Sequence, residues 1–151
     1  MSSHLVFRMG QFEARFPTER RYATNHMWVR ETGPGTLRCG FSAYAVRLML
    51  DVYFLEWHIE AGTAIERGQE IGAIESKKAE SSLYAPLAGE LQQFNQELLT
   101  DPSAINLDNY GVGWLFDIEG PFADTMTAAE YLEFLAIAWE KTRRNLRGQL
   151  G

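Results

Sequence analysis

The sequence has little cysteine and no long apolar run, and each shortage excludes a class of protein. The single cysteine, Cys39, rules out an internal disulfide and fits a reducing compartment. No apolar stretch approaches the roughly 20 residues that cross a bilayer, and the N-terminus lacks the features of a secretory signal. We therefore expect a cytoplasmic protein that is not associated with a membrane. Cys39 could serve as a redox thiol, although a lone strand cysteine is more often a small core residue.

Positive charge is also in deficit. With 14 Lys and Arg against 20 Asp and Glu, the net charge is −6. A nucleic-acid-binding protein needs cations to neutralise phosphates, so this class is excluded. The charge fits a protein that docks on partners with basic rims, but a surface kept acidic for solubility explains it equally well. The length of 151 residues suits one domain that buries about two-thirds of its unfolded surface.

No catalytic constellation is visible in the sequence. His4, His26 and His58 are scattered and have no cysteine at ligand spacing, which argues against a zinc site. There is no Gly-rich phosphate loop before a helix and no Gly-x-Ser-x-Gly elbow. Glu75 and Glu80 could be imagined as a hydrolytic pair, but on a solvated hairpin they lack the burial that would separate their pKa values. We expect a protein that is not an enzyme.

The sequence does predict a lysine amine exposed on a turn. Apolar residues alternate along two segments that read as strands: Ile71, Ala73, Leu83 and Ala85. Between them lies the polar run Glu75–Glu80, which predicts a tight hairpin. Such a hairpin holds Lys77 and Lys78 in water on a rigid stalk, as a covalently loaded carrier group would need. Taken alone, an exposed turn lysine is usually no more than solvated surface.

The rest of the chain predicts short strands joined by Gly and Pro turns. We expect strands over 25–29, 36–41, 52–57 and 114–118 and one ending at Phe94, short helices over 43–49 and 96–99, and a loop over 106–113. Ser42 is the expected cap of the first helix, with Tyr44, Leu48 and Met49 facing inward. Residues 5–7 and 12–16 form either a strand that pairs with the body or a partly ordered arm. Ile65, Ile71 and Ile74 are expected in one core.

The tail reads as a helix. Thr127–Glu130 matches a capping box. An apolar stripe follows: Tyr131, Phe134, Leu135, Ala138 and Trp139. The stripe could dock a partner, but most helices bury such a stripe on their own domain, so we expect it to pack on the sheet. The whole pattern indicates a mainly β fold, a sandwich or flattened half-barrel with helical ends.

Many landmarks stand in one order along the chain. They are Tyr22 with His26 and Trp28; Gly40–Ser42 with Tyr44 and Ala45; Asp51–Glu56; Gly62 and Gly68; Gly72–Ala79; Leu83–Pro86 with Gly89 and Glu90; Asn95 with Leu98 and Leu99; Asp101 and Pro102 with Ile105 and Asn106; Tyr110–Leu115; and Thr127–Tyr131. In this arrangement, residues 22–134 resemble the H-protein family of the glycine cleavage system, whose members are lipoyl carriers.

The resemblance implies a lipoyl/biotinyl-type half-barrel with short helices and a C-terminal helix. It suggests an N-terminal arm or extra strand over 1–21, a carrier domain over 22–120, and a C-terminal helical part over 121–151 packed on that domain. The family's lipoylated lysine follows Glu-Ser and one variable residue and precedes alanine, which places lipoate on Lys78 and puts Lys77 in the variable position. Neighbouring strand residues point to opposite faces, so only one of the two lysines can occupy the apex.

The resemblance further implies a shuttle. The lipoyl arm accepts the methylamine group of glycine from a pyridoxal-phosphate glycine decarboxylase and passes it to an aminomethyltransferase, and dihydrolipoyl dehydrogenase re-oxidises the dithiol. A lipoate ligase or octanoyltransferase attaches the arm. The carrier itself supplies position and protection, and we expect it to act as a monomer.

Three positions depart from the family. The serine, glutamate and aspartate that hold the loaded amine are Asn25, Met27 and Ser82 here. Two carboxylates that would pair with a protonated methylamine are therefore missing, and charge-assisted hydrogen bonds are the strong ones. Glu80 could replace them in part. In addition, Leu50 occupies a family glycine position, and the segment from Glu56 to Gly62 is one residue longer.

These departures leave two alternatives open. The chain could be a lipoate carrier of the same fold for another pathway, such as sulfur oxidation or a lipoate assembly relay, or it could be an unmodified scaffold. A biotinyl carrier shares the hairpin architecture, but that family sets its lysine between methionines, whereas Ser76 and Ala79 flank the lysine pair here.

Overall fold

The computed structural model describes the backbone of residues 3–150 and the side chains of residues 3–144. The strands are β1 (His4–Met9), β2 (Phe12–Pro17), β3 (Arg21–Tyr22), β4 (Met27–Gly33), β5 (Thr36–Phe41), β6 (Val52–Trp57), β7 (Ala64–Ile65), β8 (Glu70–Ser76), β9 (Glu80–Tyr84), β10 (Gly89–Phe94) and β11 (Phe116–Glu119). The helices are α1 (Ala43–Met49), α2 (Glu97–Thr100), α3 (Ala104–Leu107) and α4 (Ala128–Leu150).

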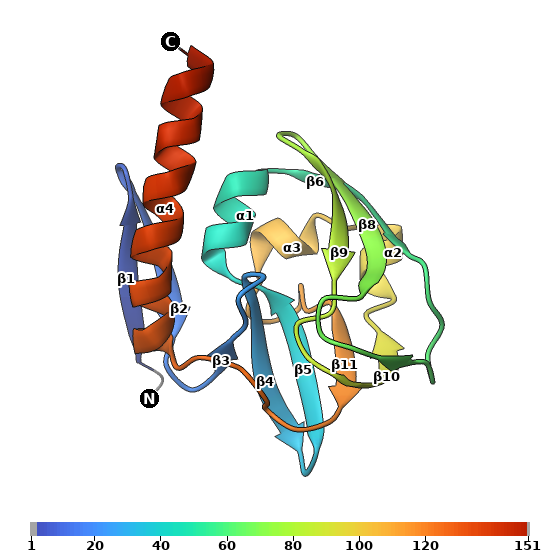
Figure 1. The fold of residues 1–151 in the computed structure, drawn as a ribbon. Helices are drawn as coiled ribbons and strands as arrows, with labels where there is room; N and C mark the ends of the chain where they lie inside the picture. Colours follow the sequence, from blue (N-terminus) through green and yellow to red (C-terminus); the bar gives the residue numbers. More distant parts are fainter. Residues whose placement is uncertain (1–2, 151) are drawn as a thin grey trace.

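Two antiparallel sheets form the body of the protein. One has the order β3-β4-β5-β11-β10-β7 and the other has the order β6-β8-β9. Aliphatic side chains from both sheets, including Val29, Leu37, Ile74 and Leu83, form one buried core. Figure 1 shows the three-stranded sheet beside the larger one, with the short helices at one end. The expected mainly β sandwich with short helices and a C-terminal helix is therefore confirmed.

A second core joins the two ends of the chain. Strands β1 and β2 pair with each other as a separate two-stranded sheet, not with the body. Tyr131 of α4 is fully buried, stacks on Tyr22 with ring centroids 4.7 Å apart and meets Phe16 edge-on at 5.3 Å. Aromatic pairs favour such offset and edge-on contacts. In the stripe on α4, Tyr131 and Leu135 are buried and the other three side chains are half-buried. The stripe therefore packs within the protein as expected, but largely against this N-terminal hairpin and less against the sheet of the body (Figure 1).

The strand before the lysine hairpin does not keep a strict period of two. Ile71 and Ala73 were expected on the same face, yet Ile71 and Ile74 are the buried pair, and Ala73 is only partly buried. The pairing register of β8 with β9 shifts between Glu70 and Gly72. A β-bulge of this kind inserts one unpaired residue and reverses the inward and outward positions beyond it. The isoleucines nevertheless share one core with Ile65, as expected.

Local predictions elsewhere hold with a few corrections. The bounds of α1 and β6 match the expected 43–49 and 52–57. The loop expected over 106–113 is wrong at its start, because α3 continues to Leu107 after its N-cap at Ser103. Leu48 was expected to face inward but is 37% exposed.

The capping box is confirmed, since the backbone N–H of Thr127 donates to Glu130 over 2.8 Å and that of Glu130 donates to the Thr127 hydroxyl over 3.2 Å. Cys39 is a buried core residue, and burial raises the pKa of its thiol.

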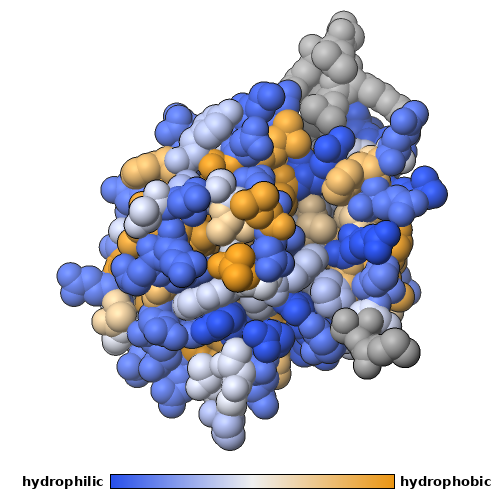
Figure 2. All heavy atoms as spheres, turned by 180° about the vertical axis from the view of Figure 1, so that it is seen from behind, coloured by the Kyte–Doolittle hydropathy of each residue, from blue (hydrophilic) through white to orange (hydrophobic). Residues whose placement is uncertain are grey.

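The face of the molecule seen in Figure 2 is mainly hydrophilic. On the face seen in Figure 2, apolar residues lie in small groups among hydrophilic ones. Scattered exposed apolar side chains are normal for a folded domain. Within the described residues, no helix combines the length and apolarity that crossing a membrane requires.

Candidate functional site

The connection between β8 and β9 is a tight turn. Ser76 and Ala79 close it, because the Ser76 N–H donates to the Ala79 carbonyl over 2.8 Å and the Ala79 N–H donates to the Ser76 hydroxyl over 3.2 Å. Ser76 is 8% exposed, so its side chain anchors the turn from inside. Lys77 and Lys78 are both exposed at the tip. The presented amine that the sequence predicted is therefore set on a short, internally bonded stalk.

The segment after α1 fixes where this tip lies. The backbone N–H of Lys77 donates to the Asp51 carbonyl over 2.8 Å, and that of Lys78 donates to the Met49 carbonyl over 3.4 Å. The side chain of Asn106 holds this segment in place. Its amide N–H donates to the Leu50 carbonyl over 2.6 Å, and its amide oxygen accepts from the backbone N–H of Val52 over 2.9 Å. The position of Asn106 in the sequence gave no sign of this role, because its two partners lie more than 50 residues away along the chain.

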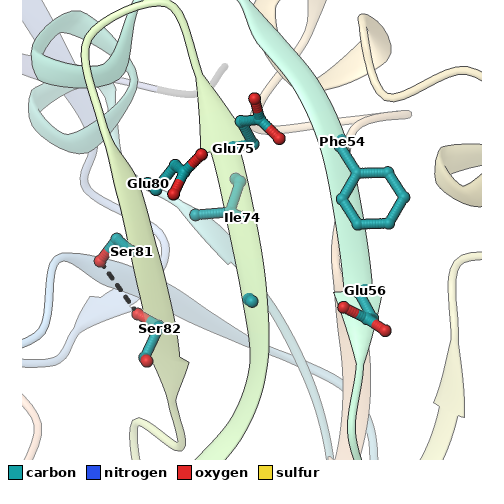
Figure 3. A pocket seen from close by; sticks show the side chains of 8 residues that line it. Phe54, Glu56, Ile74, Glu75, Glu80, Ser81 and Ser82 are labelled. Carbon is teal, nitrogen blue, oxygen red and sulfur yellow. Dashed lines mark hydrogen bonds between the residues drawn. The ribbon is translucent and has the colours of Figure 1, made fainter.

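Glu75 and Glu80 lie opposite each other on β8 and β9, as expected for residues that flank a hairpin. Together with Glu56 and Phe54 they line a shallow hollow of about 410 Å³ on the outer face of the three-stranded sheet (Figure 3). Both glutamates are exposed. Glu75 and Glu80 are therefore not a buried carboxylate pair of the kind that acid–base hydrolysis requires.

A cleft lies on the other side of the hairpin. It has a volume of about 310 Å³ and brings together all three positions that depart from the family pattern, Asn25, Met27 and Ser82. Its other lining residues are His26, Phe41, Ala45, Leu48, Met49, Ile74, Ala79, Ser81, Leu83 and Tyr84. None of these described lining residues is a carboxylate. Glu80, which was considered as a replacement, lines the outer hollow and is not part of the cleft.

The one titratable imidazole in the cleft is held neutral. Burial lowers the pKa of His26 to about 4. Its Nδ1 lies 2.8 Å from the Tyr131 hydroxyl, which in turn lies 2.9 Å from the Ser42 hydroxyl. His26 also has φ of +70°, a left-handed conformation in which His, Asn and Asp are enriched among non-glycine residues. The cleft beside the hairpin is thus uncharged near neutral pH.

This burial makes stability depend on pH. Between pH 6.5 and pH 4 the unfolded chain binds a proton at His26 that the folded protein does not, so the free energy of unfolding falls as the pH falls through this window. We expect His26 to account for a loss of about 3 kcal/mol between pH 7 and pH 4. His26→Asn, which keeps the left-handed backbone but cannot titrate, is expected to flatten that part of the profile. Urea unfolding of both proteins at several pH values measures the difference, and parallel profiles would contradict the assignment.

The three histidines remain apart. His4 lies 3.4 Å from Arg15 at the N-terminal hairpin, whereas His58 lies 3.3 Å from Glu70 and 3.7 Å from Glu56. In the part of the chain that the structure describes, no group of three His, Cys, Asp or Glu side chains is placed to hold a metal ion.

The chain is similar to known proteins in both sequence and fold. The family model of the glycine cleavage H-protein matches residues 20–138. Glycine cleavage system H proteins of Pseudoalteromonas atlantica and Mycobacterium tuberculosis are 41% and 38% identical, over 74% and 72% of this chain and 85% and 80% of those proteins. The crystal structure of a glycine cleavage system H protein from Mycobacterium marinum aligns with a TM-score of 0.71 at 32% identity, covering 80% of this chain and 99% of that one.

Proposed function

The chain belongs to the glycine cleavage H-protein family, and from this premise we propose that it carries a lipoyl arm on Lys78 and shuttles the methylamine group of glycine. In this role the protein is not itself an enzyme. It moves between a pyridoxal-phosphate glycine decarboxylase, an aminomethyltransferase and dihydrolipoyl dehydrogenase, after a lipoate ligase or octanoyltransferase has attached the arm. In this proposal residues 22–120 are the carrier domain, with an N-terminal arm or extra strand over 1–21 and a C-terminal helical part over 121–151.

The observation that carries this proposal is the exposed Lys78 on a turn whose backbone is fixed at both sides. An attaching enzyme needs a free amine in a constant position, and the Ser76–Ala79 bonds together with the contacts of Lys77 and Lys78 to the segment after α1 provide that. The tip also has open space beside it, on the cleft side through Ala79 and on the α4 side through Lys78 itself. The residues present therefore fit a lysine-linked arm.

The carrier's own side chains position and shelter the arm. When attached, the lipoyl disulfide supplies the acceptor for the methylamine group. The cleft beside Ala79 is lined mainly by apolar side chains such as Phe41, Leu83 and Met49, which exclude water from a group that lies there. Asn25 cannot turn freely toward such a group, because its amide donates to the Tyr84 carbonyl over 2.9 Å. Shelter in this protein thus depends more on exclusion of water than on counter-charge.

The experiment that tests the shuttle is direct loading. Lipoylated protein is incubated with glycine and a glycine decarboxylase, and the methylamine adduct is measured by intact mass. We expect an adduct to form. A lipoylated protein that accepts no methylamine would refute the shuttle while leaving the lipoyl carrier intact.

The lifetime of the loaded form tests the role of the cleft. Ser82→Asp places a carboxylate where the family has one, and a charge-assisted bond to the protonated amine should lengthen the lifetime of the adduct by about tenfold. Thr32→Asp, exposed on β4 and absent from the lining of the cleft, is the matched control and should leave the lifetime unchanged. Equal lifetimes in both variants would show that the cleft does not hold the loaded arm.

A second function is favoured by one observation, the absence of any carboxylate among the described lining residues of the cleft. A lipoate carrier for another pathway, such as sulfur oxidation or lipoate assembly, would not need to neutralise an amine. An unmodified scaffold would need no arm at all. A lipoylated protein that accepts no methylamine in the loading experiment would favour the carrier for another pathway. A protein that gains no lipoyl mass after expression with lipoate would be an unmodified scaffold.

A further inference from the structure

We propose that the uncharged, unloaded lipoyl arm of Lys78 rests in a second groove, formed between β1, α1 and α4. This inference depends on the proposed lipoylation of Lys78 and adds a docking site for the arm in its resting state. The groove shares Leu48 with the cleft, but its other lining residues differ, and the cleft lies on the side of Asn25 and Met27.

The groove begins at the attachment point. It has a volume of about 590 Å³, and Lys78 is itself one of its lining residues. Cavities of roughly 300–1,000 Å³ are the usual size of small-molecule sites. The β8–β9 tip lies beside the end of α1, where the backbone N–H of Lys78 donates to the Met49 carbonyl (Figure 1). An arm attached at Lys78 therefore has this groove directly beside its attachment point.

The far wall comes from parts of the chain outside the family match. Met9 lies on β1, and Trp139 and Thr142 lie on α4, whereas the family model covers residues 20–138. Met9 is 5% exposed and packs in the second core together with Trp139. The N-terminal hairpin and the extended helix thus hold each other in place and present a fixed wall to Lys78. The groove is a feature that this chain adds to the family core.

The chemistry of the wall suits an aliphatic chain that ends in a sulfur ring. Leu48 and Leu50 supply aliphatic surface on the α1 side, and Trp139 supplies an aromatic ring on the α4 side. Sulfur makes favourable contacts with aromatic edges. The Thr142 hydroxyl is already bonded, donating to the Ala138 carbonyl over 3.0 Å and lying 3.3 Å from the Tyr44 hydroxyl. It therefore presents mainly its methyl group as a partner for the arm.

The charge of the groove selects the unloaded arm. Among its described lining residues the charged ones are Arg47 and Lys78, and none is a carboxylate. Lipoylation turns the Lys78 amine into a neutral amide, which leaves the Arg47 guanidinium, held 4.5 Å above the Phe12 ring. A protonated methylamine beside this cation would be repelled, whereas the neutral dithiolane would not. The loaded arm is therefore directed away from this groove.

Leu50, one of the lining residues of the groove, has a strained backbone. Leu50 has φ of +59° and ψ of −139°, a conformation that glycine adopts readily and leucine rarely. Strain of this kind clusters at ligand sites. Here the strained residue adds an apolar side chain to the groove next to Lys78.

Protein lipoylated by a lipoate ligase, with the modification of Lys78 verified by mass, tests the proposal. In ¹H–¹⁵N spectra we expect the Trp139 indole N–H to shift between the unmodified and lipoylated proteins, with contacts from the dithiolane protons to its ring. The indole of Trp28, fully buried and bonded to the Asn109 carbonyl, is the internal reference and should not shift. No change at Trp139 in verified lipoylated protein would overturn the groove but not the lipoylation.

Reduction of the dithiolane by a soluble phosphine gives an independent readout. Thr142→Glu, which fills the groove with a longer charged side chain, is expected to speed reduction about three- to tenfold by releasing the arm. Ile137→Glu, on the same helix and 65% exposed, is the control and should match the wild type. Circular dichroism verifies that both variants keep α4. Equal reduction rates in all three proteins would contradict the proposal, and a chain not lipoylated at Lys78 would refute both this inference and the proposed function.

Discussion

Lipoate incorporation is expected to be abolished in Lys78→Arg and retained in Lys77→Arg. Both lysines are exposed at the same turn, so the difference does not arise from burial. It arises from the register of the turn, because the Ser76–Ala79 bonds give the two lysines different positions at the tip and an attaching enzyme reads one of them. Lys78 is also the one that lines the groove against α4. Intact mass after incubation with a lipoate ligase measures the result.

Arginine is a suitable replacement because it keeps the charge and length while removing the acylatable amine. Each variant should unfold at the same urea concentration as the wild type, since neither side chain is part of a core. A lipoyl adduct on Lys78→Arg, or its loss from Lys77→Arg, would show that the register of the turn has been misassigned.

Gly72→Ala is expected to lower the free energy of unfolding by about 3 kcal/mol. A Cβ at this position would lie 2.4 Å from the backbone oxygen of Glu56 and 2.9 Å from the Trp57 ring. The oxygen belongs to β6, which pairs in regular register with β8 from Phe54 to Trp57, so it cannot move without disturbing the ladder. Because β8 carries the lysine hairpin, the same change should also reduce the rate of lipoylation. Urea denaturation measures the stability.

The control for this substitution is Gly33→Ala. No atom lies within 4 Å of the Cβ that it would add. Its effect should stay within about 0.5 kcal/mol. If the two variants unfolded at the same urea concentration, the close approach of β6 and β8 at Gly72 would be contradicted.

The sequence predicted the elements that depend on local chemistry. The Ser42 cap fixed the start of α1, and the Thr127–Glu130 box fixed the start of α4, because each is a bond between residues close in sequence. The lysine hairpin was visible for the same reason. The landmarks along the chain also identified the family. The family match and the solved relative confirm that identification.

Features that depend on distant contacts were not visible. The bulge near Ile71 follows from how β8 meets β9, and its one local signal is Gly72, a glycine inside the strand. The pairing of β1 with β2 under α4 depends on Phe16, Tyr22 and Tyr131, which come together only in the folded chain.

The candidate site shows the same division between local and distant contacts. The sequence named Asn25, Met27 and Ser82 as separate departures from the family. The structure places them around one uncharged cleft. The neutral state of His26 follows from burial against α4, which a local reading could not supply.

Tandem mass spectrometry of the hairpin peptide tests the central claim most directly. The protein is expressed with lipoate, digested and fragmented so that cleavage between Lys77 and Lys78 assigns the adduct to one lysine. The account predicts a single lipoyl group on Lys78. A lipoyl group on any other lysine, or an unmodified hairpin beside an active ligase, would contradict it.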